Sequence, residues 1–259
     1  MGSHSFRTRL PHFRFNQCLM LTILHTNDFH GRLDAERADA IRERKESSGA
    51  VYFDSGDCIK AGNLAVPLKP EAAWPLLARA GCDAGTIGNR ESHVLESGLQ
   101  AKLAGHEHPI VCANMRTKDG RLVFPEVHFL EKQGVRIGIV GVMVPIVTAR
   151  MASRHASAYL WEAPIPAAKV QAEAIRNQVD CLIAITHIGH RQDLELAEIC
   201  PEFDFILGGH SHTVLDEPVR VGDTFICQGG SHGRFVGRYV WHGRGRLDDA
   251  DLIPLPGSR

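Results

Sequence analysis

Short apolar runs alternate with amphipathic or polar stretches along most of the 259-residue chain. Short apolar runs bounded by polar residues are typical of buried strands, whereas longer stretches with apolar residues every three or four positions are typical of helices. The pattern predicts strands over Leu21–Leu24, Val51–Phe53, Ala84–Ile87, Ile110–Cys112, Val135–Val142, Cys181–Ile185 and Phe205–Leu207. It predicts helices over Ala35–Glu46, Glu71–Ala80, Leu95–Ala104, Ile165–Val179 and Asp193–Ile199. Strands separated by helices predict a largely parallel sheet.

Two later segments depart from this alternation. Val127–Lys132 and Arg136–Val142 flank Gly134 as the arms of a hairpin would, and Thr224–Gln228 followed by Phe235–Trp241 suggests a second hairpin. We therefore expect a second sheet with mixed strand directions.

The domain organisation is expected to be simple. No repeat, low-complexity tract or linker interrupts residues 20–259, so we expect one domain there. Residues 1–19 are interpreted as an N-terminal extension or leader, with Met20 a plausible internal start. The tail from Gly243 to Arg259 is polar and is expected to end the domain or fray. No apolar stretch approaches the roughly 20 residues of a membrane span, so no contact with a membrane is expected.

Composition narrows the classes of function. The chain has 29 basic and 30 acidic residues and a formal net charge of -1, which gives no overall field to attract a nucleic acid polymer or an anionic membrane. Its seven cysteines are odd in number and form no CxxC pair, which argues against a disulfide framework and predicts a reducing compartment, the cytoplasm. Fifteen histidines favour a metal site, because imidazole is the commonest protein ligand of transition metals.

Five polar motifs each directly follow a predicted strand. They are Thr26-Asn27-Asp28-Phe29-His30-Gly31, Asp54-Ser55-Gly56-Asp57, Gly88-Asn89-Arg90-Glu91, Thr186-His187-Ile188-Gly189-His190 and Gly208-Gly209-His210-Ser211-His212. In open α/β sheets the carboxyl ends of the strands share one crevice where ligands bind. In an extended chain, residues i and i+2 point the same way, so Asp28 with His30, and His210 with His212, can each address one ion. The motifs together predict a metal site.

These motifs, in this order, resemble the calcineurin-like metallophosphoesterase superfamily. Residues 23–31, which include the Asp28-x-His30 pair, look specifically like the opening of the 5'-nucleotidase catalytic domain. The resemblance covers the chain from Met20 to about Trp241. It implies an α/β fold, a four-layer α/β/β/α sandwich of two mixed sheets flanked by helices.

The resemblance also implies the ligands of two divalent ions. One ion would be held by Asp28, His30, Asp57 and His212. The other would be held by Asp57, Asn89, His187 and His210, with Asp57 bridging. Such ligands suit Mn, Zn, Fe or Co better than calcium, and the sequence does not choose among the four. The implied activity is phosphoester hydrolysis by a metal-bridging hydroxide, expected to act on a small phosphomonoester such as a nucleotide.

The third motif departs from the family pattern. Arg90 stands where the family has a histidine beside the ligand Asn89, and His93 stands where the 5'-nucleotidase branch has an aspartate that orients that histidine. Arginine does not give up a proton at neutral pH, although its planar fork suits a phosphoryl oxygen. Asn89, Arg90 and His93 are therefore the candidate catalytic residues. Three outcomes stay open: Arg90 acts as an electrostatic clamp, His93 acts as the acid, or the site keeps its metals and has lost most activity.

The second departure concerns substrate binding. Two-domain 5'-nucleotidases carry a C-terminal domain that supplies nucleoside-binding aromatics, and this chain is expected to lack it. A partner chain, a second copy in a homo-oligomer or a smaller substrate would then complete the pocket. The alternatives to a phosphomonoesterase are a phosphodiesterase on cyclic or dinucleotide substrates, a hydrolase like the family's thiosulfohydrolase branch, and a metal-binding regulatory or interaction protein with impaired catalysis.

Several other polar residues have expected roles besides metal binding. Glu91 and Asp193 are candidates for hydrogen bonds that orient ligand histidines, and His190 is a candidate to line the pocket. His232, within Gly229–Gly233, has two interpretations, an approach to the cleft and a surface turn, of which the surface turn is favoured. His106 and His108 lie beside Pro109 and are expected in a solvated turn.

Overall fold

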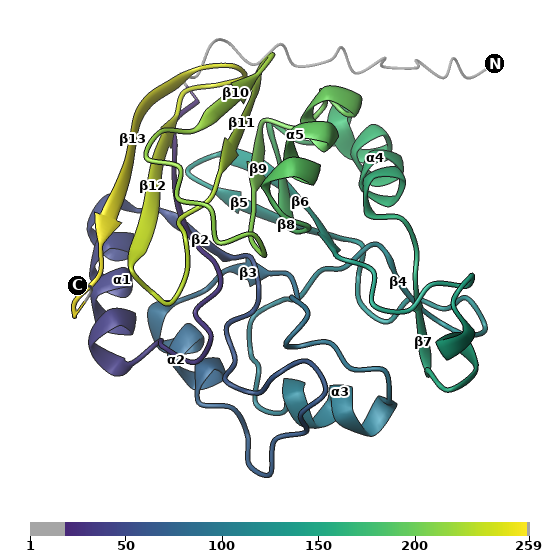
Figure 1. The fold of residues 1–259 in the computed structure, drawn as a ribbon. Coiled ribbons are helices and arrows are strands. Elements are labelled where there is room, and N and C mark those ends of the chain that lie inside the picture. The colour runs from purple at the N-terminus through teal and green to yellow at the C-terminus, as the bar shows by residue number, and fades with distance from the viewer. Residues whose placement is uncertain (1–18, 258–259) are drawn as a thin grey trace, which may run out of the picture.

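The computed structural model describes residues 19–257 of the chain (Figure 1). The extension predicted at the N-terminus therefore lies outside the described residues, except for Leu19. Among the described residues, no helix combines the length and the apolar character that crossing a membrane requires.

The first sheet has five strands in the spatial order β13-β12-β1-β2-β3. Their bounds are β1 Leu21–Thr26, β2 Val51–Asp54, β3 Ala84–Gly85, β12 Phe235–Trp241 and β13 Leu247–Pro254. Strands β1, β2 and β3 run parallel, whereas β12 is antiparallel to both of its neighbours. The sheet is therefore mixed.

The second sheet has six strands in the order β10-β11-β9-β8-β6-β5 and is also mixed. Their bounds are β5 Val127–Lys132, β6 Val135–Met143, β8 Cys181–His187, β9 Phe205–Leu207, β10 Val219–Val221 and β11 Thr224–Cys227. The hairpin predicted around Gly134 is confirmed, because β5 and β6 pair antiparallel across a tight turn. A small third sheet pairs β4 (Met115–Thr117) with β7 (Tyr159–Trp161), and the sequence pattern gave no sign of it.

Five α-helices connect these strands. They are α1 Ala35–Ser48, α2 Ala73–Ala80, α3 Glu96–Leu103, α4 Pro164–Ile175 and α5 His190–Ile199. All five helices predicted from the sequence are present. A short 3-10 helix (Arg176–Gln178) follows α4, and α5 begins three residues earlier than predicted, at His190.

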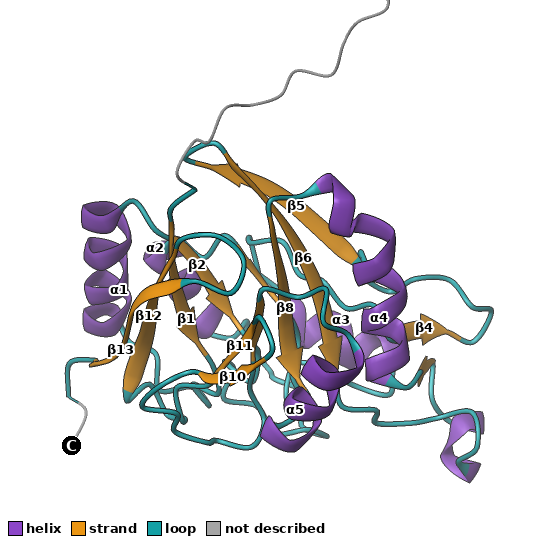
Figure 2. Cartoon of the chain, turned by 90° about the horizontal axis from the view of Figure 1, so that it is seen from above, coloured by secondary structure: helices purple, strands orange, loops and turns teal. Residues whose placement is uncertain are grey.

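Apolar side chains form three separate layers, because the strands of both sheets bury both of their faces. On β1, Leu21 and Ile23 belong to the cluster between the two sheets, whereas Leu24 belongs to the cluster under α1 and α2. On β8, Ile183 packs between the sheets and Leu182 packs under α4 and α5. Figure 2 shows the resulting order of helices, sheet, sheet and helices. The predicted sandwich of two mixed sheets flanked by helices is confirmed.

The parallel strands end level with one another. In the first sheet Thr26 pairs with Asp54, and Asp54 pairs with Gly85. In the second sheet β8 pairs in parallel with both β6 and β9. Each of the five motifs therefore begins at the same edge of its sheet, and this edge holds the candidate site.

The second predicted hairpin is wrong. Strand β11 lies in the second sheet, beside β9 and β10, whereas β12 lies in the first sheet, between β1 and β13. Each strand pairs where its apolar side chains can be buried: Ile226 packs under the helices of the second sheet, and Tyr239 and Trp241 pack between the sheets. The segment 228–234 therefore crosses from one sheet to the other.

Two other predictions are corrected. The segment Ile110–Cys112 is not a strand. Within it only Ile110 forms an isolated β-bridge, to Gly85 of β3.

The tail does not simply fray, because Leu247–Pro254 forms β13 along the whole of β12. Its acidic residues face Arg238 of β12, which pairs with Asp249 at 2.7 Å and Asp251 at 2.8 Å. A polar composition here marks an exposed edge strand.

His108 is buried, contrary to the expected solvated turn. The segment after it continues the first sheet, with Gly85 N–H donating to the Pro109 carbonyl at 2.9 Å. This pairing carries the His108 ring inward beside Trp74, where 7% of the residue is exposed and Nδ1 has no hydrogen-bond partner among the described residues. Burial, with a small contribution from His106, lowers the pKa of His108 to about 4.

This burial predicts a loss of stability in acid. Between pH 6.5 and pH 4 the unfolded chain binds a proton at His108 that the folded chain does not, so the free energy of unfolding falls as the pH falls. Relative to His108→Leu, we expect the wild type to lose about 3 kcal/mol between pH 7 and pH 4, measured by urea unfolding. The matched control His155→Leu changes an exposed histidine and should keep the wild-type dependence. Parallel pH curves for wild type and His108→Leu would contradict the prediction.

Candidate metal centre

The seven predicted metal ligands converge from both sheets. Asp28 and His30 follow β1, Asp57 follows β2 and Asn89 follows β3, all in the first sheet. From the second sheet, His187 ends β8, and His210 and His212 follow β9. Their polar atoms form two groups that meet at Asp28.

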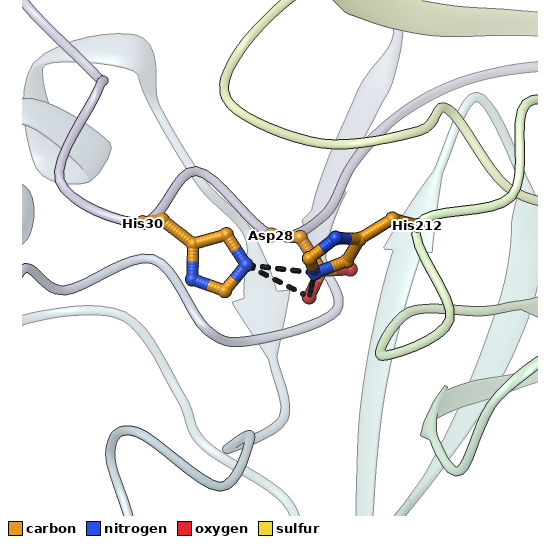
Figure 3. Close-up of side chains that lie close together, drawn as sticks. All are labelled: Asp28, His30 and His212. Carbon is orange, nitrogen blue, oxygen red and sulfur yellow. Dashed lines mark hydrogen bonds and ion pairs between the residues drawn. The ribbon is translucent and has the colours of Figure 1, made fainter. Parts of the chain in front are cut away.

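The first group contains Asp28, His30 and His212 (Figure 3). Asp28 Oδ1 lies 3.5 Å from His30 Nε2 and 3.3 Å from His212 Nε2. The two ring nitrogens are 2.8 Å apart. Three candidate donor atoms therefore point at one small volume.

The second group contains Asp28, Asp57 and His187. His187 Nε2 lies 3.6 Å from Asp57 Oδ1 and 4.0 Å from Asp28 Oδ1. The side-chain oxygen of Asn89 lies 3.2 Å from His187 Nε2 and 2.9 Å from His210 Nδ1, so Asn89 and His210 extend this group.

Asp57 lies between the two groups. Its Oδ1 faces His187, and its Oδ2 is 3.9 Å from His30 Nδ1. Asp28 also reaches both groups through Oδ1. Two carboxylates thus stand between imidazoles supplied by opposite sheets.

The donor set fits divalent cations. Asp28 Oδ1 is buried and has no hydrogen-bond partner among the described residues, although three imidazole nitrogens surround it. A buried carboxylate oxygen without a donor is costly, and a bound cation relieves that cost. His187 Nδ1 lies 2.7 Å from the Ser55 carbonyl, so in the neutral ring Nδ1 carries the proton and Nε2 has the lone pair that a metal needs.

The electrostatics of the cluster also favour positive charge. Burial alone would raise the pKa of Asp28, but the nearby rings of His212, His30 and His187 outweigh it and hold that pKa well below its usual range. Burial would likewise lower the pKa of His187, but the charge of Asp57 outweighs it and raises that pKa to about 9. The carboxylates therefore attract a proton to His187, and a divalent cation would compete for the same oxygens.

The backbone of the ligands is left-handed, which corrects the expected extended geometry. Asp28, His30, Asp57, His210 and His212 have φ angles of 54°, 51°, 54°, 75° and 55°. Such angles are strained for residues other than glycine and cluster at functional sites. The turns let the loop after β1 continue the sheet, because Asp28 N–H donates to the Gly56 carbonyl at 2.9 Å and His30 N–H to the Asp57 carbonyl at 2.8 Å.

Two glycines allow the loops after β2 and β3 to touch through their backbones. A Cβ on Gly56 would lie 2.4 Å from the Gly88 nitrogen, and a Cβ on Gly88 would lie 2.2 Å from Asp57 Oδ1. No side chain larger than a hydrogen atom fits at either position. The loop of Asn89 therefore lies directly against Asp57.

Of the two residues predicted to orient ligands, Glu91 holds backbone N–H groups and Asp193 holds a side-chain hydroxyl. Glu91 accepts N–H groups from Asp57 at 2.8 Å, Gly88 at 2.8 Å and Ile59 at 3.1 Å. Asp193 accepts the hydroxyl of Thr186 at 2.6 Å, immediately before His187, and burial raises its pKa to about 7. Neither carboxylate bonds to a ligand ring.

His190 lies beside the loop of His210 and His212. Its backbone N–H donates to Ser211 Oγ at 3.0 Å, between these two histidines. As the first residue of α5, it connects that helix to the loop after β9.

Arg90 and His93 occupy different surroundings. The backbone N–H of Arg90 donates to Asp57 Oδ1 at 2.7 Å, and its guanidinium Nε lies 3.9 Å from Asp57 Oδ2. His93 is buried against α3, where its Nδ1 accepts the Leu95 N–H at 3.0 Å and its ring touches Gly98. Arg90 thus adjoins the cluster, whereas the described contacts of His93 are with α3.

Two residues beside the cluster were not singled out as site residues from the sequence. Asn63 accepts a hydrogen bond from the side-chain amide of Asn89 at 2.9 Å, which turns the oxygen of Asn89 toward the histidines. His232, expected in a surface turn, has its ring 5.0 Å from that of His30 and 5.9 Å from that of His212. Neither residue has a motif of its own, although the glycines around His232 indicate an unusual turn.

Comparisons with known proteins point to one kind of enzyme. No known protein-family model matches the chain. The chain is 29% identical over 282 residues to the trifunctional nucleotide phosphoesterase YfkN of Bacillus subtilis, covering 91% of this chain and 19% of that protein. It is 28% identical over 295 residues to the 5'-nucleotidase of Vibrio cholerae, covering 91% of this chain and 51% of that one. The chain therefore spans only part of the curated relatives it matches.

A solved structure shares the fold. The calcineurin-like phosphoesterase YfkN from Bacillus subtilis superposes with a TM-score of 0.73 at 19% identity, covering 92% of this chain and 91% of that chain. The two chains therefore share the fold.

The position of Asp57 between the two groups predicts a shared role in metal binding. We expect Asp57→Asn, which keeps the shape and removes the charge, to lower the bound metal per chain to half or less, measured by elemental analysis after dialysis. Asp119→Asn, at an exposed turn, is the matched control and should bind as much metal as the wild type. Undiminished metal in Asp57→Asn would refute a shared ligand.

Proposed function

We propose that this chain, whose homologues are 5'-nucleotidases and calcineurin-like phosphoesterases, hydrolyses small phosphomonoesters at a centre of two divalent metal ions. The observation that carries the proposal is the pair of ligand groups joined through Asp28, with Asp57 between them. Two adjacent cation sites are the arrangement used to stabilise both the attacking and the leaving oxygen in a phosphoryl displacement.

The ligands divide between the ions by distance. Asp28, His30 and His212 would hold one ion, His187, Asn89 and His210 would hold the other, and Asp57, which lies near both groups, would be shared. The mixed nitrogen and oxygen donors suit Mn, Zn, Fe or Co. When bound, such ions supply positive charge to the phosphoryl oxygens and lower the pKa of a bound water.

Arg90 is assigned to the phosphoryl group as an electrostatic clamp. Its backbone bond to Asp57 fixes it beside the cluster, and Nη1 donates to the Lys60 carbonyl at 3.2 Å, which holds the guanidinium in place. A planar guanidinium binds phosphoryl oxygens but does not protonate a leaving group. The packing of His93 against α3 favours this clamp over His93 as the acid.

The surroundings of the cluster support a small substrate. His212 has 41% of its side chain exposed, so the cluster opens to solvent on that side. A partner chain or a second copy would close the pocket there, and no nucleic acid polymer is expected.

The six cysteines among the described residues carry free thiols, which favours the cytoplasm as the proposed location.

Assays of the metal-loaded protein test this function. We expect metal-stripped protein to be inactive and protein reloaded with Mn, Zn, Co or Fe(II) to hydrolyse p-nitrophenyl phosphate, with a higher kcat/KM than for bis(p-nitrophenyl) phosphate. A preference for the diester would indicate a phosphodiesterase. Bound metal without turnover of either ester would instead support a regulatory or interaction protein.

Exchange of Arg90 tests the clamp. Without a proton donor, the rate should depend strongly on how good the leaving group is, so the wild type should hydrolyse an aryl phosphate far faster than a nucleoside monophosphate. In Arg90→His the ratio of the two kcat/KM values should shrink by about tenfold or more, because general acid catalysis is worth about 100-fold or more. Arg121→His, at an exposed turn, is the control and should keep the wild-type ratio. Equal leaving-group sensitivity in wild type and Arg90→His would overturn the clamp.

A further inference from the structure

We propose that His232 is a substrate-binding residue that donates a hydrogen bond from its ring to the phosphoryl group, as a second contact besides Arg90. This inference rests on the proposed function, because it assumes that a phosphoryl group binds at the metal cluster. Its evidence is the position and the support of the loop Gly229–Gly233, which crosses between the two sheets.

The ring of His232 lies at the open side of the cluster. It is tilted over His30 at a centroid distance of 5.0 Å and meets His212 edge-on at 5.9 Å. His232 is exposed, whereas Ser231 and Gly233 on either side are buried. The loop therefore presents one side chain beside the two histidines of the first ligand group.

The loop is fixed to the ligands rather than being a free surface turn. The backbone N–H of His232 donates to the Asp28 carbonyl at 2.7 Å. Asn27 bonds to the loop twice, from its amide to the Gly230 carbonyl at 2.7 Å and through its oxygen to the Gly229 N–H at 3.0 Å. The same amide donates to Asp28 Oδ2 at 2.7 Å. A displacement of the loop would therefore disturb the ligand Asp28 as well.

The backbone of His232 shares the conformation of the ligands. Its φ angle is 61°, and of the seven non-glycine residues with positive φ in residues 19–257, five are predicted ligands and one is His232. The seventh, Gln133, lies in the tight turn between β5 and β6. A left-handed conformation is strained for such residues and persists where the surrounding structure requires it. Here it points an imidazole at the cluster.

Ser231 leaves Nε2 of the His232 ring as the hydrogen-bond donor. Its buried hydroxyl lies 2.8 Å from His232 Nδ1. With the hydroxyl as donor, Nδ1 accepts and the ring carries its proton on Nε2, where it can be given to a phosphoryl oxygen. The neutral ring suffices for this bond, so no change of charge on His232 is needed.

The charges around His232 suit an anion. Burial lowers the pKa of His232, and neighbouring charges, among them those of Arg32 and Arg90, lower it further. The two guanidinium groups belong to the loops after β1 and β3. An anionic phosphoryl group there would be attracted by both of them.

A matched pair of variants distinguishes a role of His232 in binding phosphate from a role in supporting the metal ligands. His232→Phe keeps a ring beside His30 and removes the donor, whereas His232→Gln keeps a donor and removes the ring. Metal content is measured for both, the Kd of inorganic phosphate is measured by calorimetry on metal-loaded protein, and kcat and KM are measured with p-nitrophenyl phosphate. Gln133→Phe makes the same kind of change at a left-handed position in a distant turn and is the control.

We expect His232→Phe to weaken phosphate binding and raise KM by about tenfold to 100-fold, the effect of one hydrogen bond to a charged group, with unchanged metal content. His232→Gln should recover most of this loss, and Gln133→Phe should match the wild type. The inference is overturned if His232→Phe binds phosphate as tightly as the wild type, or if both His232 variants lose metal. Phosphate binding is measured without turnover, so a wild type that binds phosphate and hydrolyses no ester would defeat the proposed function alone.

Discussion

The buried carboxylate of Glu91 is the contact on which the candidate site depends. Its two oxygens accept N–H groups from the loop after β2 and from the loop after β3, and so hold Asp57 and Asn89 side by side. The glycines at 56 and 88 let these loops approach closely enough for one side chain to serve both. Three backbone donors that would otherwise be buried without partners are satisfied by a single residue. Asp57 and Asn89 of the second group are thus positioned by the backbone of their own loops.

Much of this arrangement could be predicted from the sequence, because it follows from strand order. Apolar runs identify β1, β2, β3, β8 and β9, and parallel strands place the residues that follow them at one edge. The motifs of Asp28, Asp57 and His187 were expected at one crevice for that reason, whereas their roles as ligands came from the family resemblance, and the three side chains do meet. The helices were predicted equally well, since a buried helix face repeats every three or four residues. Local patterns were sufficient wherever the neighbour in space was set by the next strand or helix along the chain.

Prediction failed where the partner is distant in sequence. Phe235–Trp241 alternates like a hairpin arm, yet its partners are β1 and β13 rather than β11. The left-handed turns at the ligands carry no glycine at those positions, so nothing in the local sequence reveals them. For His232 a surface turn was favoured over an approach to the cleft, and its contacts, with Asp28 and His30, involve residues about 200 positions earlier. Such features arise from packing one loop on another, which a single sequence does not display.

A buried lysine holds the backbone of the loop that carries Asn89 and Arg90. Lys102 is fully buried in α3, and its ammonium donates to the carbonyls of Arg90 and Ser92 and to those of Gly62 and Asn63. Burial lowers the pKa of Lys102, and the charge of Glu91 opposes that shift. Glu91 therefore binds N–H groups, and Lys102 binds carbonyl groups, on the same pair of loops. The backbone of Arg90 is fixed on both sides, by Asp57 at its N–H and by Lys102 at its carbonyl. A change of side chain at this position can thus alter the chemistry beside the metals without moving the loop that carries Asn89.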